Sequence, residues 1–251
     1  MADINVSLHD AQMEIFKSEA RFKVISAGRR FGKSRLAAWV LLIKALQSKS
    51  KDVFYVGPTF QQSKDIMWGM LKELGRDVIK AAHENTAVLT LINDRKIYLK
   101  GSDRPDTLRG VGLEYVVLDE YASMKPEVWE MILRPTLADV KGGAMFIGTP
   151  AGKNHFYKLF LEAQENEDWE AFQFNSTDNP LLDPKEIQAA KSSMSTQAFR
   201  QEFEATFESF SGGIFKEEWI KYVDDEADFK ENTIGHYVVS VDPAGFEAAS
   251  K

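Results

Sequence analysis

The residues best suited to chemistry lie in a short stretch near the N-terminus, SAGRRFGKS. It approximates the pattern G-x-x-x-x-G-K-[ST], whose backbone N–H groups surround phosphate oxygens. Aligned on Gly32, Lys33 and Ser34, the first glycine of the pattern is replaced by Ala27, and Gly28 follows one position late. We expect Lys33 to reach the β and γ oxygens of a nucleotide and Ser34 to ligate Mg²⁺ at a helix N-terminus.

The remaining loop residues, Arg29, Arg30 and Phe31, separate the two glycines. Two arginines inside a phosphate loop repel each other unless an anion lies between them. We therefore expect both to bind the negatively charged nucleotide. A Gly-Lys-Ser tripeptide alone is also compatible with a basic surface turn. Its context favours the phosphate loop, because an apolar, β-branched segment (22–27) precedes it and a segment with helical periodicity (34–47) follows.

A second candidate is the stretch YVVLDEY, in which four apolar residues precede Asp119 and Glu120. Asp119 would hold Mg²⁺ through water, and Glu120 would orient and deprotonate an attacking water. The alternative is a strand end that carries two solvated acids. A glutamate directly after the Mg²⁺ aspartate favours the hydrolases that drive mechanical work over the switch GTPases. At least one predicted strand (53–56) lies between the loop and this pair.

Three further polar residues complete the candidate site. In FIGTP, Thr149 follows an apolar strand and would sense the γ-phosphate. Arg109, in DRPDTLRG, could stabilise charge that develops during phosphoryl transfer. Gln12, on a short helix ahead of the loop, carries an amide that can both donate to and accept from adenine. Each has a simpler explanation: a strand-ending turn, a solvated arginine and a solvated helix face.

The elements expected to position these residues alternate between strands and helices. Periodicity and turn residues predict strands at 22–27, 53–56, 87–92, 96–100, 115–118, 144–147 and 171–174. They predict helices at 34–47, 61–74, 126–137, 155–164, 184–194 and 196–207, with a hairpin turn at 93–95. This order predicts an α/β fold with a mostly parallel sheet and helices on both faces.

Composition sets limits on the class of protein. The hydrophobic fraction of 44% indicates a globular chain, and the absence of cysteine excludes disulfides and thiolate metal sites. Because the sequence has no run of 18 apolar residues and no signal peptide, we expect a soluble protein that stays inside a cell. The net charge of −7 neither supports nor excludes nucleic acid, because a local basic face is sufficient for binding.

The pieces, in this order, resemble the large terminase subunit of tailed bacteriophages, the motor that packages DNA into a capsid. The resemblance rests on SDRPDTLRGVGLEYVVLDEYASMKPEVWEMILRPTLAD, GGAMFIGTPAGKNHFYKLF and FRQEFEATF, and it covers about residues 8–210. It implies a P-loop ATPase fold of the RecA-like class with an additional strand and a catalytic glutamate. In this family the first loop glycine is commonly absent and loop arginines are common, so the departure from the pattern fits.

The resemblance also implies roles for single residues. Gln12 matches the adenine-reading glutamine, and Gly148, Thr149 and Pro150 match the coupling motif. Arg29 matches a loop arginine proposed to act in cis. Arg109 matches an arginine that reaches into the neighbouring subunit's site, which is the arrangement we favour, although the sequence does not settle cis against trans.

Domain organisation follows from a change of composition after residue 210. We expect an ATPase domain at 1–210, a linker at 211–233 and, at 234–251, the first strand of an RNase-H-like nuclease domain. The stretch YVVSVDPAG makes Asp242 the candidate ligand for nuclease Mg²⁺ or Mn²⁺, against the alternative of a simple Asp-Pro turn. A two-metal nuclease needs several carboxylates, so we expect this stretch of chain to hydrolyse ATP without cutting DNA.

The family further implies the partners. These would be double-stranded DNA, the phage portal protein, the small terminase subunit and further copies of the chain in a ring of five on the procapsid, in the cytoplasm of the infected bacterial host. The isolated chain could be a monomer in solution, and no membrane is expected. Two alternatives remain open: a nucleic-acid helicase, which would need a second RecA-like domain, and a scaffold that binds ATP without turnover.

Overall fold

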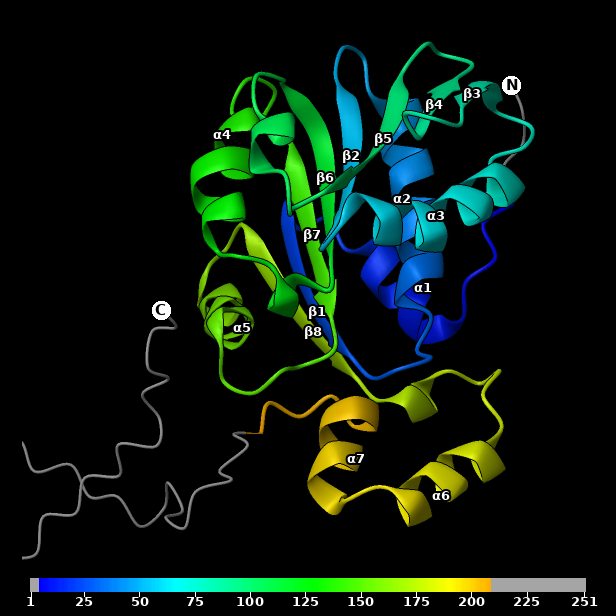
Figure 1. Ribbon diagram of the computed structural model, residues 1–251, viewed down its shortest axis with the longest axis vertical. Coiled ribbons are helices and arrows are strands. Elements are labelled where there is room, and N and C mark those ends of the chain that lie inside the picture. The colour runs from blue at the N-terminus through cyan, green and yellow to red at the C-terminus, as the bar shows by residue number, and fades with distance from the viewer. Residues whose placement is uncertain (1–4, 209–251) are drawn as a thin grey trace, which may run out of the picture. The chain divides into compact units, whose positions relative to one another are not determined.

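The computed structural model describes residues 5–208, which form an eight-stranded sheet with helices on both faces (Figure 1). The strands are β1 (Phe22–Ala27), β2 (Asp52–Gly57), β3 (Ile79–His83), β4 (Val88–Leu91), β5 (Lys96–Gly101), β6 (Leu113–Asp119), β7 (Gly143–Gly148) and β8 (Trp169–Phe174). The α-helices are α1 (Asp10–Lys17), α2 (Lys33–Gln47), α3 (Phe60–Leu74), α4 (Arg134–Thr136), α5 (His155–Glu165), α6 (Pro184–Ser193) and α7 (Thr196–Phe203). Shorter turns are η1 (Pro105–Leu108), η2 (Tyr121–Ser123), η3 (Val128–Leu133) and η4 (Ser176–Asp178).

The sheet has the order β3-β4-β5-β2-β6-β7-β1-β8. Neighbouring strands from β5 to β8 pair in parallel, and β3 and β4 add an antiparallel hairpin at one edge. All parallel strands therefore end at the same edge of the sheet, which is where α/β folds bind their ligands. The mostly parallel α/β fold predicted from the sequence is confirmed.

In the sheet, β7 lies between β1, which leads into the predicted phosphate loop, and β6, which ends in the predicted acid pair. It pairs with β1 on one side and with β6 on the other, with Ser26 opposite Gly148 and Asp119 opposite Ile147. The predicted strand 53–56 lies between them only along the chain, because β2 pairs with the opposite side of β6. The additional strand predicted between the loop strand and the acid-pair strand is present, but it is β7 and not the predicted strand 53–56.

Two hydrophobic cores hold the layers together. One lies between the sheet and α1, α2 and α3, and the other between the sheet and the segment from η2 to α5 (Figure 1). Every residue of β1 and β7 is buried, as expected for strands covered on both faces. The helices α6 and α7 lie beyond the carboxyl ends of the strands (Figure 1), and the end of α7 packs on the loop that follows β1.

Two predicted helices differ from the structure, each for a local reason. The segment 126–137 is a π-helical turn, η3, followed by the single turn α4, and the Arg134 N–H bonds the Trp129 carbonyl five residues back. Pro135 has no N–H to donate and its ring crowds the preceding turn, so the helix widens there. Sequence patterns do not predict the strand β3, which pairs with β4 at the sheet edge.

The helix predicted at 196–207 ends at Phe203. Ala205 takes a left-handed conformation (φ 54°), and its carbonyl accepts a hydrogen bond of 2.8 Å from the Gln173 amide on β8. Phe207 then packs against aromatic rings of α5, including Phe160. The end of this helix is therefore set by contacts with the sheet and α5, which helical periodicity does not report.

The proposed linker (211–233) and nuclease strand (234–251) lie outside the described residues, so these domain boundaries stay predictions. Among residues 5–208, no helix is both long and apolar enough to cross a membrane.

Candidate functional site

The phosphate loop connects β1 to α2 at the carboxyl edge of the sheet. Arg30 (φ 63°) and Gly32 (φ 99°) both take left-handed conformations, which turn successive backbone groups toward one side of the loop. Gly28 has no positive φ, but a Cβ there would lie 2.5 Å from both the Phe203 carbonyl oxygen and the Ser176 Oγ. Glycine is therefore needed at position 28 because the segment after β8 packs directly on the loop, and Ala27, inside the strand, is fully buried.

The Lys33 side chain occupies the centre of the loop. Its Nζ donates to the carbonyl oxygens of Ala27 (2.7 Å) and Gly28 (3.0 Å) and to Thr149 Oγ1 (3.2 Å). Burial lowers the pKa of Lys33, and the nearby carboxylates of Glu120 and Asp119 act in the opposite direction. The ammonium group therefore lies within electrostatic reach of the acid pair, in a partly desolvated position that an anion would stabilise.

The acid pair ends β6 in the middle of the same edge. Asp119 is buried; its Oδ2 accepts a hydrogen bond from the Tyr55 hydroxyl, and its Oδ1 accepts one of 2.9 Å from the Glu120 N–H. Burial raises the pKa of Asp119 to about 6, and the hydrogen bond from Tyr55 works against this shift. Glu120 takes a left-handed conformation (φ 54°, ψ 44°), which is strained for a residue with a side chain.

Thr149 lies between the phosphate loop and the acid pair. It follows β7, the strand between β1 and β6, and only 9% of its surface is exposed. Its hydroxyl accepts the bond from Lys33 Nζ and lies 3.5 Å from the Ala27 carbonyl oxygen. The predicted γ-phosphate sensor is therefore in direct contact with the predicted phosphate-binding lysine.

The two loop arginines lie on the exposed side of the loop, facing the segment that follows β8. The Arg29 guanidinium pairs with the Glu202 carboxylate on α7, and the Arg29 N–H donates to the Glu202 carbonyl at 2.7 Å. The Arg29 and Arg30 carbonyls accept hydrogen bonds from Ser176 Oγ (2.6 Å) and Asn179 Nδ2 (2.7 Å). The hydrogen bond to Glu202 raises the pKa of Arg29, and the negative charges of Glu202 and Glu120 act in the same direction.

Gln12 and Phe31 support the loop from the opposite side. The Gln12 amide donates to the Gly32 carbonyl at 2.9 Å, and its oxygen accepts from the His9 N–H at 3.2 Å. Phe31 is fully buried and stacks on Phe174, so its side chain belongs to the core. Gln12 thus contacts the phosphate loop, while its reading of adenine stays a prediction.

Arg109 lies near the amino ends of the parallel strands, opposite the ends that carry the acid pair and the phosphate loop. It precedes the amino end of β6, whereas Asp119 is the last residue of that strand, whose length is roughly 20 Å at the usual rise per residue. There it pairs with Asp106 (3.5 Å) and lines a surface pocket together with the ion pair between Lys51 and Asp139. The structure therefore does not bring Arg109 into the site of its own chain, and Asp242 lies outside the described residues.

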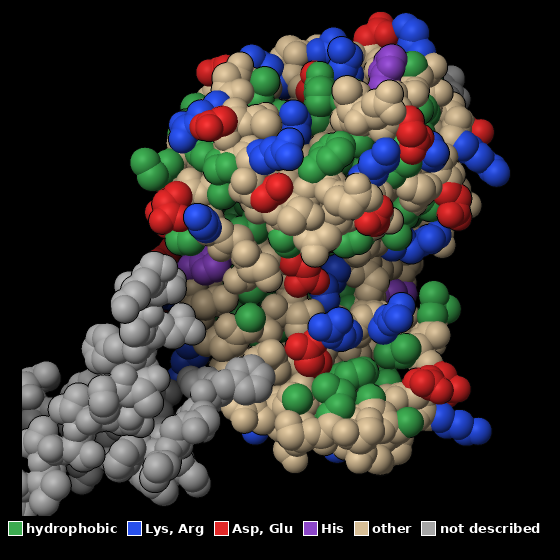
Figure 2. Space-filling model, in the orientation of Figure 1, with side chains coloured by type: hydrophobic (Ala, Val, Ile, Leu, Met, Phe, Trp, Pro, Cys, Tyr) green, Lys and Arg blue, Asp and Glu red, His purple; other side chains and the backbone are tan. Residues whose placement is uncertain are grey.

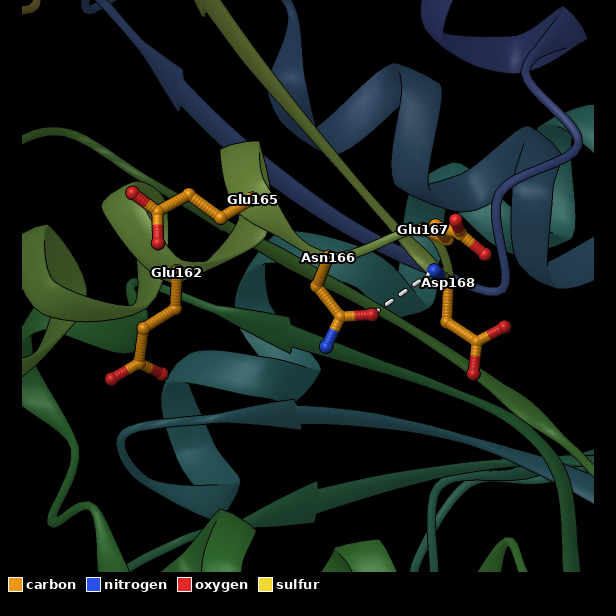
Figure 3. Close-up of a pocket in the computed structure, with 5 residues that line it drawn as sticks. All are labelled: Glu162, Glu165, Asn166, Glu167 and Asp168. Carbon is orange, nitrogen blue, oxygen red and sulfur yellow. Dashed lines mark hydrogen bonds between the residues drawn. The ribbon is translucent and has the colours of Figure 1, made fainter.

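An acidic pocket also lies far from the phosphate loop, at the turn between α5 and β8. Figure 3 shows the carboxylates of Glu162, Glu165, Glu167 and Asp168 spread in different directions around Asn166, whose Oδ1 accepts from the Asp168 N–H at 3.1 Å. Within residues 5–208, no group of three or more His, Cys, Asp or Glu side chains could hold a metal ion by itself. A metal at the phosphate loop would therefore need ligands from a nucleotide and from water.

The donors at the loop fit Mg²⁺ in that role. Mg²⁺ prefers oxygen ligands, keeps several waters and is usually bound through one or two protein groups plus substrate phosphates. The buried Asp119 carboxylate and the hydroxyl of Ser34, in the first turn of α2, are oxygen donors of this kind. The raised pKa of Asp119 also fits, because a carboxylate buried in this way gains from a cation at its free lone pairs.

Tyr55 is a site residue that the sequence motifs do not reveal. It lies within the apolar run VFYV, and a buried tyrosine hydroxyl usually finds a hydrogen-bond partner, although the sequence does not say which one. Its partner, Asp119, is 64 positions away and becomes adjacent only because β2 lies next to β6.

Comparisons with known proteins agree with this geometry. Residues 24–222 match the family described as "Terminase large subunit, T4likevirus-type, N-terminal". The chain is 27% identical to the large terminase subunit of Thermus phage G20c over 242 residues, with 82% of this chain and 50% of that protein covered. It is 30% identical to the large terminase subunit of Escherichia phage T5, with 78% and 46% covered, so it spans about half the length of these curated relatives.

Solved structures give the same result. The ATPase domain of the Thermus phage P74-26 large terminase superimposes with a TM-score of 0.70 at 26% identity, over 80% of this chain and 94% of that one. The large terminase of another thermophilic bacteriophage, in complex with ADP, has a TM-score of 0.70 at 15% identity over 80% and 54%, a likeness that shows the fold alone. Because residues 24–222 match this family, the chain belongs to the terminase large subunit family, and the match is to the N-terminal part of that subunit.

Proposed function

We propose that this chain is the ATP-hydrolysing motor domain of a viral terminase large subunit that drives double-stranded DNA into a procapsid. The observation that carries the proposal is the meeting of three strand ends at one edge of the sheet. Lys33 of the phosphate loop contacts Thr149 after β7, and both lie beside the acid pair that ends β6. The family match and the likeness to a terminase ATPase domain support the same reading.

In this proposal each residue acts on a bound ATP. Lys33 would leave the carbonyls of Ala27 and Gly28 and hold the β and γ oxygens. Glu120 would take a proton from water as the water oxygen bonds to the γ-phosphorus, and the bond to the ADP oxygen would break. Ser34 and Asp119 would hold Mg²⁺, which neutralises charge on the phosphate oxygens when bound.

The contacts of the loop also suggest how hydrolysis would reach the rest of the domain. Arg29 is paired with Glu202 of α7, and its side chain is 67% exposed, so it can be drawn toward a γ-phosphate. Thr149 would report the same phosphate to β7. Binding and loss of that phosphate would therefore change the contacts of the loop with η4 and α7.

The partners belong to this proposal as well. They are double-stranded DNA, the portal protein, the small terminase subunit and a ring of copies, with five as the proposed number, in the cytoplasm of the infected bacterial host; the isolated chain would be a monomer in solution. A motor contacts DNA phosphates through Lys and Arg without reading sequence. On the face in Figure 2, basic and acidic side chains are interspersed, so no extended field of one sign marks the DNA path there.

Removing the Tyr55 hydroxyl should shift the acid limb of the pH profile of ATP hydrolysis to higher pH. A hydrogen bond to a charged group contributes about 1.5–3 kcal/mol, so Tyr55→Phe should raise the pKa of Asp119, already about 6, by about one to two units. Near neutral pH part of Asp119 would then be protonated and unable to bind Mg²⁺, and activity should return as the pH rises.

The measurement is kcat/KM for ATP against pH at fixed Mg²⁺. Tyr115→Phe is the matched control, because the Tyr115 hydroxyl is buried in the neighbouring strand and has no hydrogen-bond partner in the described part of the chain. An unchanged acid limb in Tyr55→Phe would show that the hydroxyl does not keep Asp119 ionised.

The position of Arg109 predicts that ATP hydrolysis depends on neighbouring copies. If Arg109 completes the site of another chain, hydrolysis per chain should rise with protein concentration, and Arg109→Ala should lower it on the order of 1,000-fold or more. Mixing Arg109→Ala with Glu120→Gln chains should restore activity, because one variant supplies the arginine and the other supplies the acid pair.

Lys51→Ala is the control for this experiment, since Lys51 lines the same surface pocket as Arg109. It should leave hydrolysis unchanged. A constant, non-zero activity per chain at all concentrations would contradict the trans role and assign the cation to Arg29 or Arg30 of the same chain.

A further inference from the structure

The strained backbone of Glu120 has to be held by its surroundings. A residue with a side chain takes a left-handed conformation at a cost, and it persists only where neighbouring contacts fix it. Glu120 is preceded by the buried Asp119, whose Oδ1 takes the Glu120 N–H at 2.9 Å. The residues that follow Glu120, Tyr121 and Ala122, must be fixed as well if the side chain is to keep one direction.

Both carbonyls after Glu120 are bound by side chains from the start of α5. The His155 Nε2 donates to the Tyr121 carbonyl oxygen at 2.9 Å, and the Asn154 Nδ2 donates to the Ala122 carbonyl oxygen at 3.1 Å. The His155 ring also packs edge-on against the Tyr121 ring, with centroids 4.9 Å apart. Two consecutive side chains thus bind two consecutive carbonyls. The Asn154 bond joins residues 32 positions apart in the sequence, and the His155 bond joins residues 34 positions apart.

Asn154 and His155 follow Thr149, which comes directly after β7. The backbone of Gly148 lies against the acid pair, since a Cβ built there would be 3.5 Å from the Tyr121 N and 3.7 Å from the Glu120 Cα. Asn154 has a second role, because its Oδ1 caps α5 by accepting the Phe156 N–H at 3.0 Å. The short connection between β7 and α5 is therefore fixed at both ends on the residues around Glu120.

We propose that Asn154 and His155 are positioning residues that hold Glu120 in its catalytic orientation through the carbonyls of Tyr121 and Ala122. The inference rests on the proposed role of Glu120 as the base for hydrolysis. Neither side chain has to touch ATP. Because both lie on the segment that leaves the γ-phosphate sensor Thr149, a movement of that segment is passed to Glu120 through two hydrogen bonds.

Three variants separate positioning from folding. His155→Leu fills the space without a donor, His155→Gln returns an amide donor, and Asn154→Ser keeps a helix cap with a side chain too short to reach Ala122. We expect His155→Leu and Asn154→Ser to lower kcat by about 10- to 100-fold. The dissociation constant of ATP should stay within about twofold of wild type, and His155→Gln should recover most of the lost rate.

A crystal structure of His155→Leu gives a readout that does not depend on activity. We expect the φ of Glu120 to leave the left-handed region, where it is now 54°. Wild-type kcat in both His155→Leu and Asn154→Ser, or an unmoved Glu120 in that structure, would overturn the inference. A wild-type chain that binds ATP without hydrolysing it would instead overturn the proposed function, and the position of Glu120 in the variant would still decide the inference.

Discussion

Glu120→Gln should remove ATP hydrolysis and leave ATP binding intact. The amide keeps the size of the side chain but cannot take a proton from water, and general-base catalysis typically contributes about 10²- to 10⁴-fold. Glu120 is partly exposed at the edge where Lys33 and Thr149 meet, and it is not part of the core. Steady-state hydrolysis and equilibrium binding of ATP, measured on the same preparation, test this expectation.

Glu114→Gln is the matched control for that experiment. Glu114 lies on the same strand as the acid pair but at its amino end, where it accepts a hydrogen bond from Ser48 Oγ at 3.1 Å. It should hydrolyse ATP at the wild-type rate. If Glu120→Gln behaves like wild type, the chain binds ATP as a scaffold without turnover at this site, and the hydrolase proposal is wrong.

Lys33→Ala should both weaken ATP binding and slow ATP hydrolysis strongly. Lys33 contacts both the loop carbonyls and Thr149, so it lies where phosphate oxygens would be held. Removing a cation that stabilises transition-state charge costs on the order of 100- to 1,000-fold in kcat. Loss of a charged hydrogen bond, worth about 1.5–3 kcal/mol, should also weaken ATP binding by about 10- to 150-fold.

Lys49→Ala provides the comparison for Lys33→Ala. Lys49 is exposed just beyond the other end of α2, so its loss changes the net charge equally without touching the loop. Calorimetric titration with ATP and a hydrolysis assay should separate the two variants clearly. Retained ATP affinity in Lys33→Ala would show that the phosphates bind elsewhere on the chain.

The parts of this site that could be predicted from sequence are those in which local pattern and position in the fold agree. The loop 27–34 lies between an apolar strand and a periodic helix, and parallel strands place their carboxyl ends at one edge. Asp119, Glu120 and Thr149 each follow such a strand, and the structure brings them together with Lys33. The late glycine at position 28 is explained only by the structure, because α7 and η4 pack on it.

The parts that could not be predicted depend on contacts between distant segments. Tyr55 meets Asp119 because of strand order, which periodicity does not report. Asn154 and His155 carry no motif of their own and gain a role only where α5 packs against η2. Arg109 lies before the amino end of β6, away from the site of its own chain, and its favoured role in a neighbouring chain stays a prediction.

The most direct measurement is a crystal structure of the Glu120→Gln chain with ATP and Mg²⁺. The account predicts that Lys33 Nζ leaves the carbonyls of Ala27 and Gly28 and contacts the γ-phosphate beside Thr149, with Asp119 and Ser34 at the metal. ATP bound at another surface, with Lys33 still hydrogen-bonded to the two loop carbonyls, would contradict it.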